Sequence, residues 1–381
     1  AAYIGLSNFS LRSKADNFTP EEAGSIAELK GGKKLYCAVN IYFHQDDLKK
    51  LEASLDEINE YPFDAFIVSD LGIVPLLKKH FPGVRLHLST QANCVNGEAA
   101  KIYRDLGFSD IILAREVSLS EIKTIKETAP HLELEGFVHG AMCLAYSGRC
   151  FLSAYMAGRS GNRGDCAHSC RWEYRVLEEA ERPGEYYPVI EEDGHTTILS
   201  SKDLCMIDHI SNLYKSGLDS VKIEGRMKSI YYTAIVTRAY RKMIDAVVFG
   251  KQVPDMQAFR EELFHISHRE YSTGFYFGPE EISQPVQSSY IRTHLLLGTL
   301  RRKSGNGESS AAKRYLLNVK NSIHKGDTIE YIGPNVVSIP DSTFRLFDAD
   351  GEETDAAHHG REYYIETEKP VGESFIIRRK V

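Results

Sequence analysis

The sequence predicts an α/β protein: a TIM-barrel-like domain of strand–helix units, followed by a small C-terminal β-barrel domain. Up to about residue 230, the chain repeats a short apolar strand, a polar loop and an amphipathic helix, a pattern typical of parallel strands covered by helices. From about Val286 it changes to alternating strands separated by turns such as 325–327 and 348–351. Eight continuous strand–helix units favour a TIM-type barrel over an open sheet.

The strands expected in the first domain are short and apolar. They cover residues 2–5, 35–40, 65–69, 86–90, 111–114, 136–139, 197–200 and 220–224. Two helix starts carry clear signals: Thr19 begins a capping box with Pro at the first helical position, and Ser118 with Glu121 opens a helix at 121–128. A helix over 229–249 closes the domain.

The pattern of apolar and polar residues along the chain suggests three segments. We expect the barrel at 1–250 with a cysteine-rich insert at 140–175, a linker or mixed segment at 251–285, and the β-barrel at 286–381. Strands expected in the β-barrel are 295–300, 315–319, 328–331, 343–347, 363–366 and 374–378. Because the chain opens within an apparent strand and without Met, we expect it to be truncated at its N-terminus.

The composition is that of an ordinary globular protein, with 42% hydrophobic and 26% charged residues. Its apolar runs are far shorter than the roughly 20 residues of a membrane helix, and we see no secretory signal. We therefore expect a cytoplasmic protein with no membrane partner. A net charge of −7 argues against nucleic-acid binding over the whole surface, but it leaves room for local basic patches.

Polar residues gather where the expected strands end. They are Ser7-Asn8, Asn40, Ser69-Asp70, Ser89-Thr90-Gln91, Arg115, His139, Ser200-Ser201-Lys202-Asp203 and Glu224-Gly225-Arg226. In a TIM-type barrel these positions line the mouth, where substrates bind. Turns also begin at strand ends, so a single polar residue there indicates little. Together they predict a polar mouth.

Five of the seven cysteines lie between 143 and 205, spaced C-x6-C-x15-C-x3-C and then Cys205. In a chain without signs of secretion, such clustering indicates metal binding or catalysis rather than disulfides. Thiolates bind both iron–sulfur clusters and zinc, and the spacing alone does not choose between them. Glycines at 140, 148, 161 and 164 would let the backbone curl around a metal centre. We expect Cys37 and Cys94 to be packing residues.

Residues 136–171, 200–205 and 222–228 together resemble peptidase family U32, in particular the branch containing the tRNA 5-hydroxyuridine synthesis proteins. The resemblance spans nearly the whole chain. It implies an RNA-modifying enzyme that hydroxylates a tRNA uridine, with prephenate as the hydroxyl source and tRNA or another RNA as partner. A paralogous protein or a second copy of the chain is a further expected partner.

The resemblance also implies a cofactor. Family members that hydroxylate ubiquinone precursors hold a 4Fe–4S cluster through four cysteines, and one such set is spaced closely like the cysteines here, with one gap longer by a residue. The implied ligands are Cys143, Cys150, Cys166 and Cys205. Cys170 is the alternative ligand and zinc the alternative metal.

On this hypothesis, acid–base and charge-stabilising side chains lie near the cysteines. The expected catalytic residues are His139, Arg163, Glu224 and Arg226, and the expected substrate contacts are Arg149, Asn162, Arg171 and Lys228. Arginine clamps phosphates or a carboxylate by paired hydrogen bonds, although loop-bracing ion pairs would also explain these arginines, and a buried hydrogen-bonded role would explain His139. Basic residues at 301–303, 313–314 and 378–380 are candidate contacts to an RNA backbone.

Two other functions stay open. The family name suggests a collagenase-like peptidase, for which Cys166 and His168 form the local thiol–imidazole pair. The sequence has no H-E-x-x-H or G-x-S-x-G motif. A non-catalytic scaffold or partner subunit is the third reading.

Overall fold

The computed structural model describes residues 1–6, 8–11, 18–143, 145–172, 190–192, 195–197, 201–225, 227–278, 290–302 and 313–381. The chain forms two compact units: unit 1 comprises residues 1–228 and 269–289, and unit 2 comprises residues 229–268 and 290–381. The long helix α9 (Ile230–Val247) thus belongs to unit 2, a grouping that differs from the sequence segments bounded at 250 and 286.

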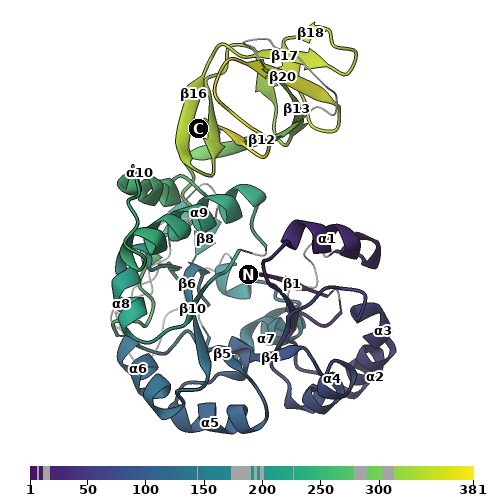
Figure 1. The fold of residues 1–381 in the computed structure, drawn as a ribbon, viewed down its shortest axis with the longest axis vertical. Helices are drawn as coiled ribbons and strands as arrows, with labels where there is room; N and C mark the ends of the chain where they lie inside the picture. Colours follow the sequence, from purple (N-terminus) through teal and green to yellow (C-terminus); the bar gives the residue numbers. More distant parts are fainter. Residues whose placement is uncertain are drawn as a thin grey trace. The chain divides into compact units, whose positions relative to one another are not determined.

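Seven parallel strands form the frame of unit 1 (Figure 1). They are β1 (Ala2–Gly5), β2 (Leu35–Val39), β3 (Ala65–Val68), β4 (Arg85–Leu88), β5 (Asp110–Ile112), β6 (Glu133–Ala141) and β10 (Ser220–Ile223). Each pairs with the next from β1 to β6, and β10 pairs with β6. Seven of the expected strands are therefore confirmed. Strand β3 is buried along its whole length, as expected for a sheet covered on both faces.

Of the eighth expected strand, at 197–200, Thr197 alone is described, and it does not join this sheet. Strands β7 (Ile190–Glu192) and β8 (His195–Thr197) form a separate hairpin, and 198–200 lie outside the described residues. Instead, β9 (Asp203–Cys205) pairs antiparallel with the end of β6 and parallel with β11 (Tyr271–Ser272). The observed architecture is a curved, mainly parallel α/β sheet. Among the described residues, the pairings do not include β1 with β10.

Helices lie outside the strands of unit 1 (Figure 1). They are α1 (Ala23–Lys30), α2 (Gln45–Ala53), α3 (Leu55–Ile58), α4 (Val74–His80), α5 (Gly97–Asp105), α6 (Leu119–Thr128) and α8 (Ile210–Lys215). The capping box predicted before α6 is confirmed, because the Ser118 side chain accepts from the Glu121 amide and the Glu121 carboxylate accepts from the Ser118 amide, at 2.7 Å. At Thr19 a 3-10 turn (Pro20–Glu22) precedes α1.

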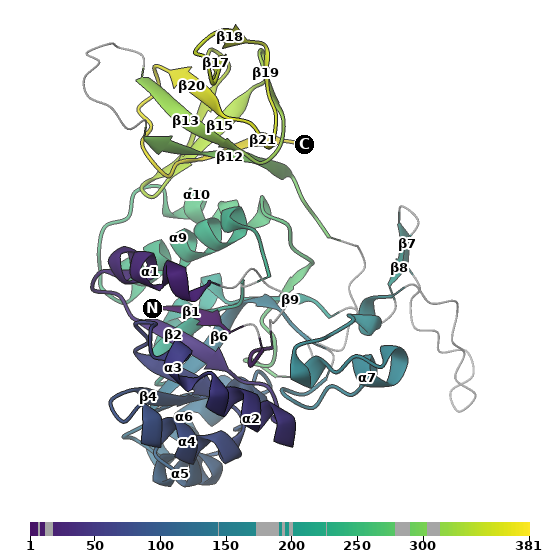
Figure 2. The same ribbon diagram turned by 90° about the vertical axis from the view of Figure 1, so that its right-hand side faces the viewer.

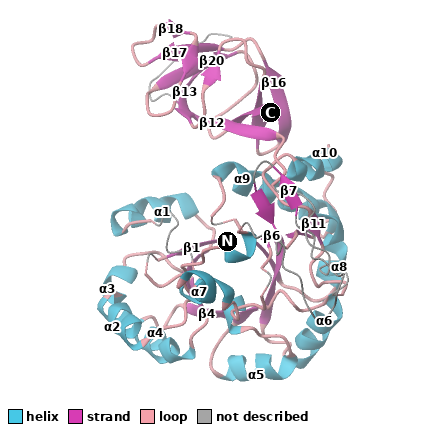
Figure 3. Ribbon diagram, turned by 180° about the vertical axis from the view of Figure 1, so that it is seen from behind, coloured by secondary structure: helices cyan, strands magenta, loops and turns pink. Residues whose placement is uncertain are grey.

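The segment between β6 and β9 carries α7 (Leu152–Ala157). Figure 2 shows α7 standing away from the parallel strands, and in Figure 3 it lies in front of them. Since the segment begins where β6 ends, it lies at the carboxyl side of the sheet. Within the described ranges, no helix is both long and apolar enough to cross a membrane.

In its described residues, unit 2 combines two α-helices with an antiparallel sheet in the order β16-β15-β21-β12-β13-β20-β17-β18. Its helices are α9 and α10 (Met256–Glu261). Its strands are β12 (His294–Arg302), β13 (Lys313–Val319), β14 (Ile323–His324), β15 (Ile329–Gly333), β16 (Val336–Asp341), β17 (Arg345–Asp348), β18 (Glu353–Thr354), β19 (Ala356–Ala357), β20 (Tyr363–Thr367) and β21 (Ile376–Lys380). The six expected strands are present. The sheet has its own apolar core, which includes Leu297, Tyr331 and Ile377.

Candidate active site

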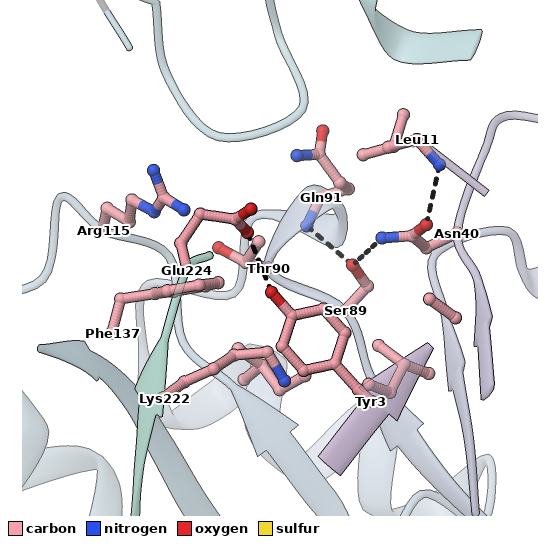
Figure 4. Close-up of a pocket in the computed structure, with 13 residues that line it drawn as sticks. Tyr3, Leu11, Asn40, Ser89, Thr90, Gln91, Arg115, Phe137, Lys222 and Glu224 are labelled. Atoms are coloured by element: carbon pink, nitrogen blue, oxygen red, sulfur yellow. Dashed lines mark hydrogen bonds between the residues drawn. The ribbon is translucent and has the colours of Figure 1, made fainter. Parts of the chain in front are cut away.

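A small cavity with both polar and apolar lining, about 60 Å³ in volume, lies at the carboxyl ends of the parallel strands (Figure 4). Its polar lining residues are Tyr3, Asn40, Ser89, Thr90, Gln91, Arg115, Lys222 and Glu224. Several of the polar strand ends expected from the sequence therefore do converge. The cavity brings a carboxylate, an ammonium, a guanidinium and neutral hydrogen-bonding groups to one place, which suits a small anionic or strongly polar ligand.

Glu224 stands directly after β10 and faces the cavity (Figure 4). Its Oε2 accepts a hydrogen bond from the Tyr3 hydroxyl at 3.0 Å, and its amide donates to the His139 carbonyl at 2.9 Å. Gly140 makes this arrangement possible: its φ is +118°, and a Cβ there would lie 2.5 Å from the Glu224 carbonyl oxygen. A side chain at position 140 would therefore push the Glu224 backbone away.

Lys222 and Glu135 form a buried ion pair beneath Glu224. The Lys222 Nζ lies 2.7 Å from Glu135 Oε1 and 4.3 Å from the centre of the Tyr3 ring. Burial acts to raise the pKa of Glu135, but the Lys222 ammonium and a hydrogen bond from Ser220 hold that pKa below its ordinary value. Glu135 is therefore ionised at neutral pH. The positive charge of Lys222 is fixed at the cavity wall.

Arg115 and Asn40 complete the polar wall. The Arg115 guanidinium lies 4.1 Å from the centre of the Phe137 ring and donates to the Ala141 carbonyl, so the ring and the carbonyl fix its plane. The Asn40 amide donates to Ser89 Oγ at 3.4 Å and its oxygen accepts from the Leu11 amide at 3.2 Å. Strand ends that are far apart in sequence are thus joined by side-chain hydrogen bonds.

Most of the other residues expected from the sequence to be catalytic lie elsewhere. His139 is 1% exposed, with its ring 3.5 Å from the Tyr271 hydroxyl, and it does not line the cavity. Arg163 binds the Asp47 carboxylate at 2.8 and 3.1 Å, which braces the loop. Arg226 lies outside the described residues. Glu224 is the member of the expected catalytic set that the structure brings into the cavity.

The expected substrate contacts are spread over the cysteine segment (residues 141–172) and the loop after β10. Asn162 donates to the Cys150 carbonyl at 3.3 Å, and Arg149 is exposed. The Lys228 amide donates to the Gly225 carbonyl at 2.9 Å. The side chain of Arg171 lies outside the described part of the chain. None of the three described side chains lines the cavity.

The five cysteines between 143 and 205 differ in exposure. Cys143 is exposed, Cys150, Cys166, Cys170 and Cys205 are half-buried, and none of them is in a disulfide. Three of the four glycines expected to curl this segment do have positive φ, at 140, 148 and 164.

The thiols are chemically suited to an iron–sulfur or zinc centre, but their positions do not assemble one. Cys205 pairs in register with His139 of β6, whereas Cys143 lies two residues beyond the end of that strand. Within the described residues, no group of three or more His, Cys, Asp or Glu side chains is placed to hold a metal ion.

The sequence missed Lys222 and Tyr3 as site residues. A signal for Lys222 exists, because a lysine within the apolar strand Ser220–Ile223 needs a buried partner. The expectation that Arg378 contacts RNA is wrong: its side chain is buried and binds Glu262 and Glu330.

Comparisons with known proteins agree along nearly the full chain. A model of peptidase family U32 matches residues 1–285, and a model of that family's C-terminal domain matches residues 292–378. "tRNA hydroxylation protein P" of Escherichia coli is 36% identical over 377 residues, covering 88% of this chain and 82% of that protein. A 23S rRNA 5-hydroxycytidine synthase of the same organism is 32% identical, covering 88% of this chain and 52% of that protein. A protein named "Collagenase" from Porphyromonas gingivalis is 32% identical, and the match covers 73% of this chain and 68% of that protein.

Proposed function

The chain belongs to peptidase family U32, and we propose that it is an RNA-modifying member that hydroxylates a pyrimidine, with a tRNA uridine as the target base. The observation that carries this proposal is the match to a tRNA hydroxylation protein over 82% of that protein's length. The similarity to an rRNA hydroxycytidine synthase supports the same chemistry on a second kind of RNA. Prephenate as the hydroxyl source is part of the proposal, on the resemblance alone.

The cavity supports this function by its chemistry. Glu224 is positioned to accept or return a proton at the mouth, where general acid–base groups act. Arg115 supplies positive charge for an anionic group of the substrate or co-substrate, whereas the charge of Lys222 is balanced by Glu135. We further propose that the curved sheet closes as a TIM-type barrel, because Tyr3 of β1 bonds to Glu224, which follows β10.

A peptidase is the second candidate, supported by the family's name and by the collagenase relative. Such an enzyme would use Cys166 as the nucleophile and His168 as the base. In this structure the His168 amide donates a hydrogen bond to Cys166 Sγ, at 3.4 Å. It is a backbone contact and does not activate the thiol as an imidazole would. A non-catalytic scaffold would not account for the charged side chains that line the cavity.

The proposed cofactor is a 4Fe–4S cluster on Cys143, Cys150, Cys166 and Cys205, with Cys170 as the alternative ligand and zinc as the alternative metal. When bound, such a cluster would supply redox chemistry that side chains lack. Because no three ligands are gathered among the described residues, the proposal requires the cysteine segment to rearrange around the metal.

Metal analysis tests the cofactor. Protein purified anaerobically is expected to contain about four iron atoms and four sulfides per chain, and Cys166→Ser is expected to lose most of the iron. Cys94→Ala is the matched control, because burial raises the pKa of this thiol to about 11 and keeps it protonated. Stoichiometric zinc without iron would replace the cluster with a zinc site. Metal-free, fully folded protein would rule out both.

Nucleoside mass spectrometry tests the activity. Deleting the gene is expected to abolish 5-hydroxyuridine derivatives in bulk tRNA, and the wild-type gene on a plasmid is expected to restore them. Unchanged 5-hydroxyuridine in a strain without a paralogue would contradict the tRNA assignment. Loss of a hydroxylated cytidine from rRNA instead would retain RNA hydroxylation and change the substrate.

A further inference from the structure

The cysteine segment, residues 141–172, exposes an unusual amount of aromatic surface. Tyr155 is 76% exposed, Phe151 72% and Tyr146 60%, and Trp172 is 39% exposed. Among the described residues, only Leu29 is a more exposed large apolar side chain than Tyr155. Single exposed aromatics are normal on protein surfaces, but several in one short segment mark an interaction site.

Phe151 and Tyr155 lie one helical turn apart at α7, with ring centroids 6.4 Å apart and ring planes tilted by 37°. Both rings therefore face the same side of the helix. The segment that carries them is tied to the rest of unit 1: the Tyr42 hydroxyl donates to the Gly148 carbonyl at 2.9 Å, and Arg163 binds Asp47. The rings stand on an anchored support on the carboxyl side of the sheet, the side of the cavity.

The segment also reverses the charge of the chain. Residues 141–172 contain four arginines (149, 159, 163 and 171), one aspartate (165) and no lysine or glutamate, a net charge of +3 against −7 for the whole protein. Arg159 pairs with Asp165 and Arg163 with Asp47. Arg149 is exposed, two residues before Phe151. A positive, aromatic surface is complementary to a polyanion with flat apolar groups.

We propose that Phe151 and Tyr155 form a stacking platform for unpaired bases of the RNA substrate, with Arg149 contacting the adjacent phosphate. The inference rests on the proposed function and specifies how its substrate is held. A second copy of the chain fits this surface less well, because two segments that both carry an excess of arginine would repel each other. Unpaired bases bind aromatic rings by their faces, and each stacked base contributes about 1–3 kcal/mol.

RNA binding by the anaerobically purified protein tests the platform. We would titrate a labelled single-stranded oligouridine, and a blunt RNA duplex of the same length, and follow fluorescence anisotropy. Phe151→Ala/Tyr155→Ala is expected to weaken single-strand binding at least about tenfold, the loss of roughly one stacked base, and to leave duplex binding nearly unchanged. Phe151→Tyr/Tyr155→Phe is expected to retain wild-type affinity.

Tyr214→Ala is the matched control, because Tyr214 is a 63% exposed aromatic on α8 of the same unit, outside the segment. Trp172 gives a second readout. It is the chain's one tryptophan, so quenching of tryptophan emission by oligouridine would report ligand at this segment.

The outcomes separate the two proposals. Wild-type binding that the double substitution leaves unchanged would overturn the platform and leave the proposed function standing. No binding of either RNA by the wild type, together with unchanged tRNA hydroxylation in the deletion strain, would overturn both. A concentration-dependent dimer that the double substitution dissociates would assign the surface to self-association and overturn the platform.

Discussion

Glu224→Gln is expected to lower the rate of RNA hydroxylation by about 10²- to 10⁴-fold, the usual contribution of a positioned general acid or base. The substitution keeps the shape of the side chain, and the Tyr3 hydroxyl, which donates to Glu224 at 3.0 Å, can donate equally to the amide oxygen of glutamine. The change therefore removes the negative charge and the basic site alone. Single-turnover kinetics with an unmodified tRNA transcript would measure the effect.

Two comparisons make this result specific to the cavity. Glu98→Gln removes an exposed carboxylate on α5 of the same unit and is expected to leave the rate unchanged. Tyr3→Phe removes the hydrogen bond to Glu224 while the carboxylate stays, so a smaller loss is expected. If Glu224→Gln retained the wild-type rate with an unchanged melting temperature, Glu224 would have no role in proton transfer.

The sequence predicted the frame of unit 1 because its signals are local. Short apolar runs gave the parallel strands, and the polar residues after them gave the cavity, since parallel strands end at one edge of a sheet. The capping box at Ser118 was found for the same reason: its two partners are three residues apart.

What the sequence did not predict depends on contacts between distant residues. Lys222 is a site residue because Glu135, from another strand, holds it at the cavity. Strand β9 runs antiparallel to β6 because the cysteine segment brings the chain back to the carboxyl end of β6. The spacing of residues along the sequence does not show in which direction the chain comes back. Arg378 looked like part of a basic surface patch, but its partner Glu262 lies 116 residues away.

Unit 2 contains a group of buried charges centred on Glu262. Both of its carboxylate oxygens bind Arg378, at 2.7 and 2.8 Å, and Oε2 lies 3.4 Å from Arg238. Arg378 also donates to the Tyr231 hydroxyl at 2.9 Å and to Glu330 at 2.7 Å. The group joins α9, the 3-10 turn at 262–264 and strands β15 and β21, so removing one member leaves another charge buried without its partner.

Arg378→Met is therefore expected to lower the free energy of unfolding by about 3–5 kcal/mol, the cost of breaking a buried ion pair from one side. Urea unfolding followed by far-ultraviolet circular dichroism would measure it. Arg345→Met is the matched control: Arg345 in the same sheet also binds two carboxylates, but it is 52% exposed, so water screens its ion pairs and a much smaller loss is expected. Equal losses in the two variants would contradict the assigned role of burial.

The pH dependence of the same variant gives a sharper test. In the wild type, burial acts to raise the pKa of Glu262, but hydrogen bonds from His265 and Arg378 hold that pKa below its ordinary value. The group then stabilises the fold at neutral pH, and this contribution is lost as the pH falls through the folded-state pKa.

Without Arg378, burial dominates and the pKa of Glu262 rises above its unfolded value, so protonation stabilises the variant. The stability difference between wild type and Arg378→Met should consequently shrink as the pH is lowered from neutral toward the ordinary glutamate pKa. A difference that stays constant over that interval would mean that Glu262 remains ionised by its contacts with Arg238 and His265 alone.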